Sequence, residues 1–280
     1  MIKKKIAFQG ELGAYSHIAC KELFKDAIIK PCKTFEEVFQ SAYEDEDCKI
    51  LIPLENSLAG RVADIHYLLS KFKLQIHAEH FQRVEHNLLV KKEATIEDIK
   101  YVRSHAQAIG QCQNIINKYN FEQIVSADTA GSAKELSKSK DKTIAAIASN
   151  LSAEIYGLKI LKKNVEDDKG NVTRFLVMGK KIEQPEFNQD IRYITTCIFS
   201  LKSEPSSLYK CLGGFATNQV NLTKLESFSV KNTFDQVNFY LDLEGHIEDR
   251  SVQKAMEELG FHTTSLDVLG VYKASKFRKK

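Results

Sequence analysis

A repeated alternation of strand-like and helix-like patterns runs from the start of the chain to about residue 157. Each apolar strand pattern ends in a short polar turn, and a stretch with apolar residues on one helical face follows it. The strand patterns cover residues 6–8, 28–29, 49–54, 101–104, 123–125 and 143–148. Strands that alternate with helices pair in parallel and carry helices on both faces of the sheet. The alternation therefore predicts an α/β fold.

Residues 171–178, Asn-Val-Thr-Arg-Phe-Leu-Val-Met, combine a polar start with an apolar strand. In an open α/β sheet, ligands bind beyond the strand ends, so a hydroxyl beside a guanidinium there is a candidate anion site. The same residues could also begin an ordinary buried strand. This stretch alone does not separate the two interpretations.

Polar residues also follow the strand pattern at 49–54, which we expect to end at Pro53. Glu55, Asn56 and Ser57 come directly after it, at the sheet edge where ligands bind. Asn and Ser are also common helix caps, and capping of a following helix would explain them equally well.

Two further turns carry groups suited to anions. Ser104 and Gln111 flank the start of a single expected helix, whose inner face holds the apolar residues between 109 and 119. Residues 10–16 form a glycine-containing turn before a helix, where the first N–H groups lack partners inside the helix. That turn lacks the spacing of G-x-G-x-x-G or of a P-loop, so the sequence does not support nucleotide binding.

The chain is expected to cross twice between two sets of strands, near residues 74–86 and 166–173. Two lobes joined by such crossings would enclose a cleft, as in binding proteins that close around small anions. We therefore expect the polar turns to face a cleft between two lobes.

A change of rhythm after about residue 180 predicts a second domain. Charged residues, Gln, Asn and one Pro between 180 and 190 are typical of a linker. Beyond it, strand and helix patterns alternate over residues 193–201, 208–216, 220–230, 237–243, 252–259 and 268–272, with Gly260 expected to end the second helix. The order βαββαβ is that of the ferredoxin-like module.

Composition argues against several classes of partner. Forty Lys and Arg against 37 Asp and Glu leave a net charge of +3, too balanced for a nucleic-acid-binding face. No apolar run approaches the roughly 18–20 residues of a membrane span, and the run after Met1 is too short for a secretory signal. The six cysteines show no C-x-x-C spacing, which argues against a zinc site or a disulfide framework. We expect a cytoplasmic protein.

Four short motifs, in order along the chain, resemble signatures of the prephenate dehydratase family. Residues 10–16, Gly-Glu-Leu-Gly-Ala-Tyr-Ser, are similar to its glycine turn, and residues 52–57 to its Pro-x-Glu-Asn-Ser signature. Residues 104–112 are similar to a second signature, with Ala106 where proline is usual, and residues 171–175 to the Thr-Arg-Phe motif. The resemblance covers essentially the whole chain, because the C-terminal module is similar to a regulatory ACT domain.

The resemblance implies conversion of prephenate to phenylpyruvate, with loss of water and carbon dioxide, in L-phenylalanine biosynthesis. It implies a periplasmic-binding-protein-like dehydratase region over residues 1–180, with one lobe of about 1–76 and 160–180 and another of 77–159. A linker at 181–192 and an ACT domain at 193–275 would follow. It also implies a homodimer or homotetramer, and neither a metal nor an organic cofactor. We expect no fused chorismate mutase, because the residues outside these domains leave no room for its helices.

The resemblance assigns catalysis to Thr173, Ser104 and Gln111. Thr173 would donate to the departing oxygen; since a hydroxyl is a weak acid, it would stabilise charge or relay a proton. Substrate binding is assigned to Glu55, Asn56, Ser57, Arg174 and Phe175. For Glu55, repulsion from a dianionic substrate favours an orienting role. Arg174 could clamp a carboxylate, or it could face the other side of the strand.

The predicted effector site departs from the family pattern. It comprises Ser206, Ser207, Leu208, Asn221, Leu222, Glu226 and Ser227. The usual Gly-Ala-Leu reads Ser-Ser-Leu at 206–208, and the usual Glu-Ser-Arg-Pro reads Glu-Ser-Phe-Ser at 226–229. Loss of Arg and Pro removes a rigid, cationic turn. Feedback inhibition by L-phenylalanine is the leading hypothesis for this module.

Two other functions fit the same pattern. Arogenate dehydratase acts on a substrate with an amine in place of the keto group. A non-catalytic amino-acid sensor would also have a cleft and an ACT module, but it would not need Thr173 together with Ser104 and Gln111.

Overall fold

The computed structural model describes residues 4–62, 65–202, 204–229 and 237–278. The chain forms two compact units. One comprises Met1–Val38, Leu51–Val62 and Phe81–Phe175, and the other comprises Phe39–Ile50, Ala63–His80 and Leu176–Lys280. These units cut across the predicted domains, because segments 39–50 and 63–80 group with the C-terminal part. The functional division at residues 180 and 193 stays a prediction.

The N-terminal strands belong to a six-stranded sheet, most of whose residues lie in the first unit. Its order is β2 (Ile28–Cys32), β1 (Lys5–Gln9), β3 (Cys48–Asn56), β11 (Val172–Gly179) and β5 (Gln75–Arg83), with β4 (Gly60–Arg61) paired to the end of β3. β1 and β2 are parallel and are joined through α1 (Tyr15–Leu23), as alternating patterns require. The buried residues of β3, Ile50, Leu51 and Ile52, are apolar on both faces of the sheet, which anchors the polar strand end at Asn56.

The end of β3 differs from expectation. The strand continues through Pro53 to Asn56, and the prediction that proline ends it is wrong. Proline is compatible with extended backbone and removes only one ladder donor. After Asn56 the chain turns back to form the antiparallel hairpin with β4, where a direct turn into a helix was expected. The helix α3 (Ile65–Phe72) comes only after this hairpin.

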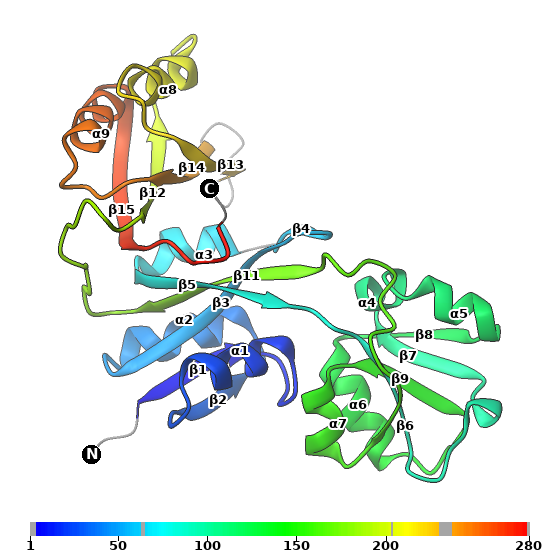
Figure 1. Ribbon diagram of the computed structural model, residues 1–280. Coiled ribbons are helices and arrows are strands. Elements are labelled where there is room, and N and C mark those ends of the chain that lie inside the picture. The colour runs from blue at the N-terminus through cyan, green and yellow to red at the C-terminus, as the bar shows by residue number, and fades with distance from the viewer. Residues whose placement is uncertain (1–3, 63–64, 203, 230–236, 279–280) are drawn as a thin grey trace. The chain divides into compact units, whose positions relative to one another are not determined.

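The second sheet of this unit is built from the middle of the chain. Its order is β10 (Lys159–Lys162), β6 (Asn87–Val90), β9 (Ile144–Ala148), β7 (Tyr101–His105) and β8 (Glu122–Ser126). Leu88 and Ile147 pack on one face against α4 (Ala106–Gly110) and α5 (Gln113–Tyr119), and Leu89 and Ala148 pack on the other face against α6 (Thr129–Lys138) and α7 (Asn150–Tyr156) (Figure 1). The predicted α/β fold is confirmed. The strands are not all parallel as the alternation predicts, because β6 pairs antiparallel with both β9 and β10.

The crossings between the two sheets lie later than the predicted lobe boundaries. Residue 76 falls inside β5, which continues to Arg83, so the first crossing occupies residues 84–86. β10 still belongs to the second sheet, so the return lies between Lys162 and Val172.

The single helix expected over residues 109–119 is two helices, α4 and α5, broken at Gln111 and Cys112. The carboxylate of Asp167, on the return crossing, accepts the N–H groups of Gln113 at 2.8 Å and Asn114 at 3.1 Å. A carboxylate at this position replaces the helical hydrogen bonds that α5 lacks at its start. The break leaves Gln111 outside both helices.

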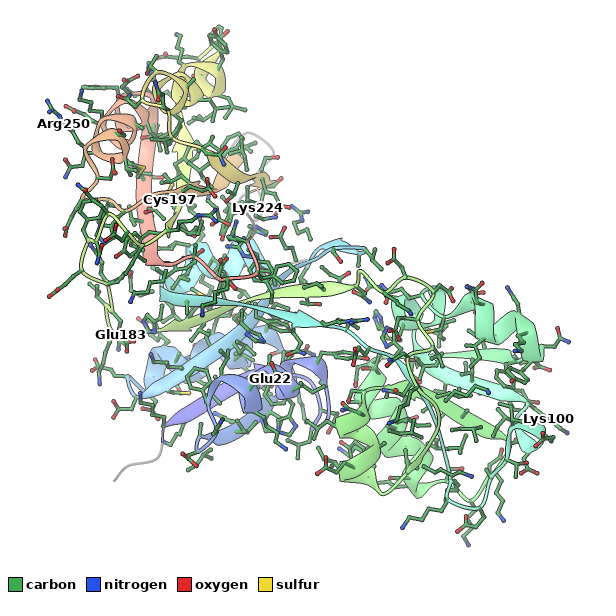
Figure 2. All side chains as sticks on the ribbon, viewed as in Figure 1. Glu22, Lys100, Glu183, Cys197, Lys224 and Arg250 are labelled. Atoms are coloured by element: carbon green, nitrogen blue, oxygen red, sulfur yellow. The ribbon has the colours of Figure 1, made fainter. Side chains whose placement is uncertain are left out.

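A ferredoxin-like module lies in the second unit. Its elements are β12 (Tyr193–Leu201), α8 (Ser207–Thr217), β13 (Leu222–Ser229), β14 (Val237–Glu244), α9 (Arg250–His262) and β15 (Thr263–Lys273). The antiparallel sheet has the order β13, β14, β12, β15, and α8 and α9 cover one face (Figure 1). Cys197, labelled in Figure 2, packs with Phe215 and Leu259 between sheet and helices. The predicted βαββαβ order is observed, except that α9 passes through Gly260; Val230 of the expected strand lies outside the described residues.

The other face of this module's sheet is covered by α3 and by part of β5, within the same unit. The ring of His66 from α3 meets that of Tyr240 edge to face at 5.1 Å. Glu79 of β5 accepts two hydrogen bonds from Arg278, at 2.7 and 2.9 Å. Both faces of the sheet are therefore buried. No helix within the described ranges is long and apolar enough to cross a membrane.

The approach of β15 to β5 gives a prediction for Gly270. A Cβ atom at this position would overlap the carbonyl oxygen of Ile76, so Gly270→Ala should lower the free energy of unfolding by about 1–3 kcal/mol. Gly260→Ala is the control, because a Cβ there meets nothing within 4 Å and alanine favours the helix by about 0.5–1 kcal/mol. Urea unfolding of both variants measures the difference. An unchanged midpoint for Gly270→Ala would contradict the close contact.

Candidate active site

The side chain of Asn56 joins the end of β3 to the start of β11. Its Nδ2 donates to the hydroxyl oxygen of Thr173 at 3.0 Å and to Oδ1 of Asn171 at 2.7 Å. Asn171 and Thr173 lie two residues apart and therefore face the same side of the extended chain. The adjacent strands thus bring together residues that are more than a hundred positions apart.

The orientation of the Asn56 amide is determined by backbone groups. Its Oδ1 accepts the N–H groups of Leu58 at 3.0 Å and Ala59 at 2.9 Å, so the amide nitrogen must face Thr173. The Thr173 oxygen consequently acts as an acceptor. Within the described residues, no group accepts the hydroxyl hydrogen of Thr173, and this partly exposed side chain can donate it to a ligand.

Gln111 continues the network from Asn171. Nδ2 of Asn171 donates to Oε1 of Gln111 at 2.7 Å, and Nε2 of His86 lies 3.0 Å from the same oxygen. Because Asn171 and His86 both lie at the Gln111 oxygen, the amide nitrogen of Gln111 points away from these two residues. That nitrogen has no acceptor in the part of the chain that the structure describes, and the residue is partly exposed. It is a second donor available to a ligand.

His86 and Tyr15 complete the network. The Tyr15 hydroxyl lies 2.8 Å from Nδ1 of His86 and 2.8 Å from the carbonyl oxygen of Glu85. Burial lowers the pKa of His86, against smaller opposing effects of Gln111 and Glu166. Burial also holds the pKa of Tyr15 well above its usual value, and electrostatic interactions with Cys112, Glu166 and Glu85 act in the same direction. Both groups are therefore neutral near pH 7.

The return crossing holds His86 and Gln111 in place. Val165 N–H donates to the carbonyl of His86 at 2.8 Å, and the carboxylate of Glu166 accepts the His86 N–H at 2.9 Å. Asp167 N–H donates to the carbonyl of Gln111 at 2.7 Å. Three consecutive residues thus fix the backbone at both positions.

The predicted catalytic residues do not all meet. Thr173 and Gln111 belong to the network through Asn56 and Asn171. Ser104 does not, because it is fully buried and its hydroxyl donates to the carbonyl of Ile147 on the neighbouring strand at 2.7 Å.

The predicted substrate-binding residues also differ in position. Ser57 accepts the Val172 N–H at 3.0 Å and donates to the Gly170 carbonyl at 2.9 Å, so it braces the start of β11. Arg174 is only 3% exposed and pairs with Glu55 at 3.2 Å. Phe175 is buried in the core. Since neighbours on a strand face opposite sides, Arg174 points away from Thr173, which favours the second of the two orientations considered for it.

Sequence reasoning missed Tyr15, His86, Asn171 and Glu166 as members of the site. Asn171 could have been found, because it shares the face of Thr173 two residues earlier. Tyr15 lies in the glycine turn at residues 10–16, but no local sequence pattern shows that its hydroxyl reaches a histidine 71 positions away. Across the described residues, no group of His, Cys, Asp and Glu side chains is arranged to hold a metal ion.

The predicted effector residues lie in separate places within the second unit. Ser206, Ser207 and Leu208 stand at the start of α8, and Asn221 and Leu222 follow its end. A helix of 11 residues, about 16 Å long, separates the two groups. Asn221 donates to Glu244 at 3.0 Å. Glu226 pairs with Lys224 at 2.9 Å, and Ser227 follows it on β13.

Comparison with known proteins identifies the family. The model of the prephenate dehydratase family matches residues 6–183, which include the whole hydrogen-bond network. The chain belongs to the prephenate dehydratase family.

Relatives of this prephenate dehydratase family member align along nearly its full length. The chain is 40% identical to the bifunctional N-acyl-homoserine lactone acylase/prephenate dehydratase of Komagataeibacter europaeus, covering 98% of both chains. It is 36% identical to arogenate dehydratase/prephenate dehydratase 2 of Arabidopsis thaliana, covering 96% of this chain and 72% of the relative. The crystal structure of the Arthrobacter aurescens prephenate dehydratase in complex with L-Phe has a TM-score of 0.90 at 25% identity, covering 99% of this chain and 92% of the other.

Exclusion of a proton from His86 predicts lower stability in mild acid. Below about pH 6.5 the unfolded chain binds a proton that folded His86, with its lowered pKa, does not, so the free energy of unfolding falls as the pH falls. His17 and His77 have pKa values lowered by burial and act in the same direction. We expect denaturant midpoints to drop between pH 7.5 and 5.5. In His86→Asn the drop should be smaller, and an equal drop in variant and parent would contradict the assignment.

Proposed function

We propose that the chain is a cytoplasmic prephenate dehydratase, which converts prephenate to phenylpyruvate with loss of water and carbon dioxide in L-phenylalanine biosynthesis. The observation that supports this most directly is the Thr173 hydroxyl, which accepts a hydrogen bond from Asn56 and keeps its own hydrogen for a ligand. Membership of the family and the second donor on Gln111 support the same activity.

The reaction needs hydrogen-bond donors where charge develops. The ring carboxylate leaves as carbon dioxide, its bonding electrons make the ring aromatic, and the ring hydroxyl leaves with one proton taken up as water. Thr173 donates to the departing oxygen, and the hydrogen bond from Asn56 polarises its hydroxyl. Such donation contributes about 10²–10⁴ in rate. The amide nitrogen of Gln111 donates to a carboxylate or keto oxygen. Ser104 remains a proposed catalytic residue with weaker support, because its hydroxyl is bound to Ile147.

Substitution of Thr173 tests this role. Thr173→Ala should reduce kcat by about 10²-fold or more without loss of folding, and Thr173→Ser should keep part of the activity. Formation of phenylpyruvate from prephenate by purified protein is the measurement. Thr217→Ala is the control, because the Thr217 hydroxyl donates to carbonyls of its own helix at 3.2 Å. Near-normal turnover in Thr173→Ala would remove this residue from the mechanism.

Arogenate dehydratase is the second candidate, because the Arabidopsis relative carries both names. The two activities differ in recognition of an ammonium or a keto group, and kcat/KM on both substrates decides between them. A pure amino-acid sensor would turn over neither substrate. The Komagataeibacter relative is also named an acylase. Thr173 is poorly suited to be the nucleophile of such a reaction, because no base takes its hydrogen within the described residues.

We further propose that the ferredoxin-like module is an ACT domain that binds L-phenylalanine. The Arthrobacter relative is described in complex with L-Phe, and the module carries Asn221, Leu222 and the residues at 206–208 and 226–227 that resemble effector motifs. Because α8 separates the 206–208 loop from Asn221, one effector molecule could contact both groups only if two chains contribute. A homodimer or homotetramer supplies such a pair.

Titration with L-phenylalanine tests the regulatory proposal. We expect a calorimetric heat of binding and a fall in turnover of prephenate. In Asn221→Ala, inhibition should weaken while basal turnover remains, because Asn221 lies in the second unit and takes no part in the hydrogen-bond network of Thr173. If L-phenylalanine produced neither heat nor inhibition in the parent protein, the module would not be its receptor.

A further inference from the structure

The hydroxyl of Tyr15 occupies a position that the proposed mechanism does not yet use. Tyr15 is the first residue of α1, directly after the glycine turn. Its ring meets that of His86 edge to face at 5.6 Å, and its hydroxyl lies 2.8 Å from Nδ1. No residue of the mechanism contacts Tyr15 directly, but His86 connects it to Gln111.

The polarity of the network determines which nitrogen of His86 carries hydrogen. Oε1 of Gln111 can only accept, and it lies 3.0 Å from Nε2 of His86. Nε2 must therefore carry the hydrogen. A neutral imidazole has one N–H group, so Nδ1 is an acceptor. The Tyr15 hydroxyl lies 2.8 Å from Nδ1 and 2.8 Å from the Glu85 carbonyl oxygen, so these two acceptors share its one hydrogen.

The reverse orientation of the Gln111 amide is disfavoured from the other end of the network. It would place the amide nitrogens of Gln111 and Asn171 against each other, where 2.7 Å now separates a donor from an acceptor. Asn171 is oriented by Asn56, and Asn56 by the N–H groups of Leu58 and Ala59. The turn after β3 thus determines the direction of Gln111, and a hydrogen bond from Tyr15 to Nδ1 of His86 favours the same direction.

We propose that Tyr15 is a positioning residue for the proposed dehydratase site, because its hydroxyl holds His86 in the Nε2–H tautomer and so keeps the amide nitrogen of Gln111 directed at substrate. This assignment rests on the function proposed above for that site. Without the hydroxyl, Nδ1 loses its donor, and only the acceptor on Gln111 still favours the hydrogen on Nε2. With the hydrogen on Nδ1, two acceptors face each other between His86 and Gln111, and the amide loses its orientation.

The Tyr15→Phe substitution removes the hydroxyl and keeps the ring. We expect KM for prephenate to rise about tenfold, the effect of one hydrogen bond to a charged group, while kcat changes less than about threefold. The ¹⁵N chemical shifts and two-bond couplings of the His86 ring at pH 7.5 should show Nε2–H in the parent protein. In the variant they should show the Nδ1–H form or a mixture.

Tyr156→Phe is the matched control. The Tyr156 hydroxyl donates to the carbonyl of Leu12 at 2.8 Å, so it braces the same glycine turn without touching His86. We expect this variant to keep the Nε2–H signals and a KM within about twofold of the parent value. If Tyr15 only braced the turn, the two variants would behave alike.

The outcomes that overturn the proposal are separate from those that overturn the dehydratase activity. Hydrogen on Nδ1 in the parent protein overturns the tautomer assignment, even if Tyr15→Phe does not fold. Unchanged ring signals in Tyr15→Phe, or a KM rise equal to that of Tyr156→Phe, overturn the role of the hydroxyl. If the parent protein does not turn over prephenate, the proposed function fails and the positioning role for that reaction fails with it, while the ring signals still decide the tautomer.

Discussion

Two backbone N–H groups, those of Leu58 and Ala59, determine the direction of the amides in the site. They bind the oxygen of Asn56, which turns its nitrogen toward Thr173 and Asn171. Asn171 then donates to Gln111. A partly buried polar network of this kind favours one arrangement because each mismatch would leave a donor against a donor. The hairpin after β3 is therefore the feature on which the two ligand-facing donors depend.

The strands and crossings place this network at the meeting point of distant segments. The apolar parts of β3 and β11 keep the two strands in register, and a slip of one residue would exchange the faces of Thr173 and Arg174. On the return crossing, Val165, Glu166 and Asp167 form hydrogen bonds with the backbones of His86 and Gln111. Rigid strands supply one half of the site, and the crossing supplies the other half.

Much of this arrangement follows from local patterns, and the rest does not. Alternating strand and helix patterns predict the α/β fold and the βαββαβ order but not the antiparallel pairs of β6, and polar strand ends predict the meeting of Thr173, Asn56 and Gln111. The break after α4 depends on Asp167, more than fifty positions away, and no periodicity reports it. The engagement of Ser104 by Ile147 and the contact of Tyr15 with His86 are likewise tertiary. Pro53 shows the limit of a local rule, since its extended backbone is tolerated within β3.

The covered outer face of the ferredoxin-like sheet has a practical consequence. Tyr240, Tyr272 and Ile198 on that face are shielded from water, and α3 and β5, encoded more than a hundred codons upstream, provide the shield. Residues 193–275 expressed alone would expose this hydrophobic face to solvent and would tend to aggregate. The module is thus poorly suited to fusion with another protein by itself, and a fusion that keeps it soluble would have to include the helix and strand at 65–80.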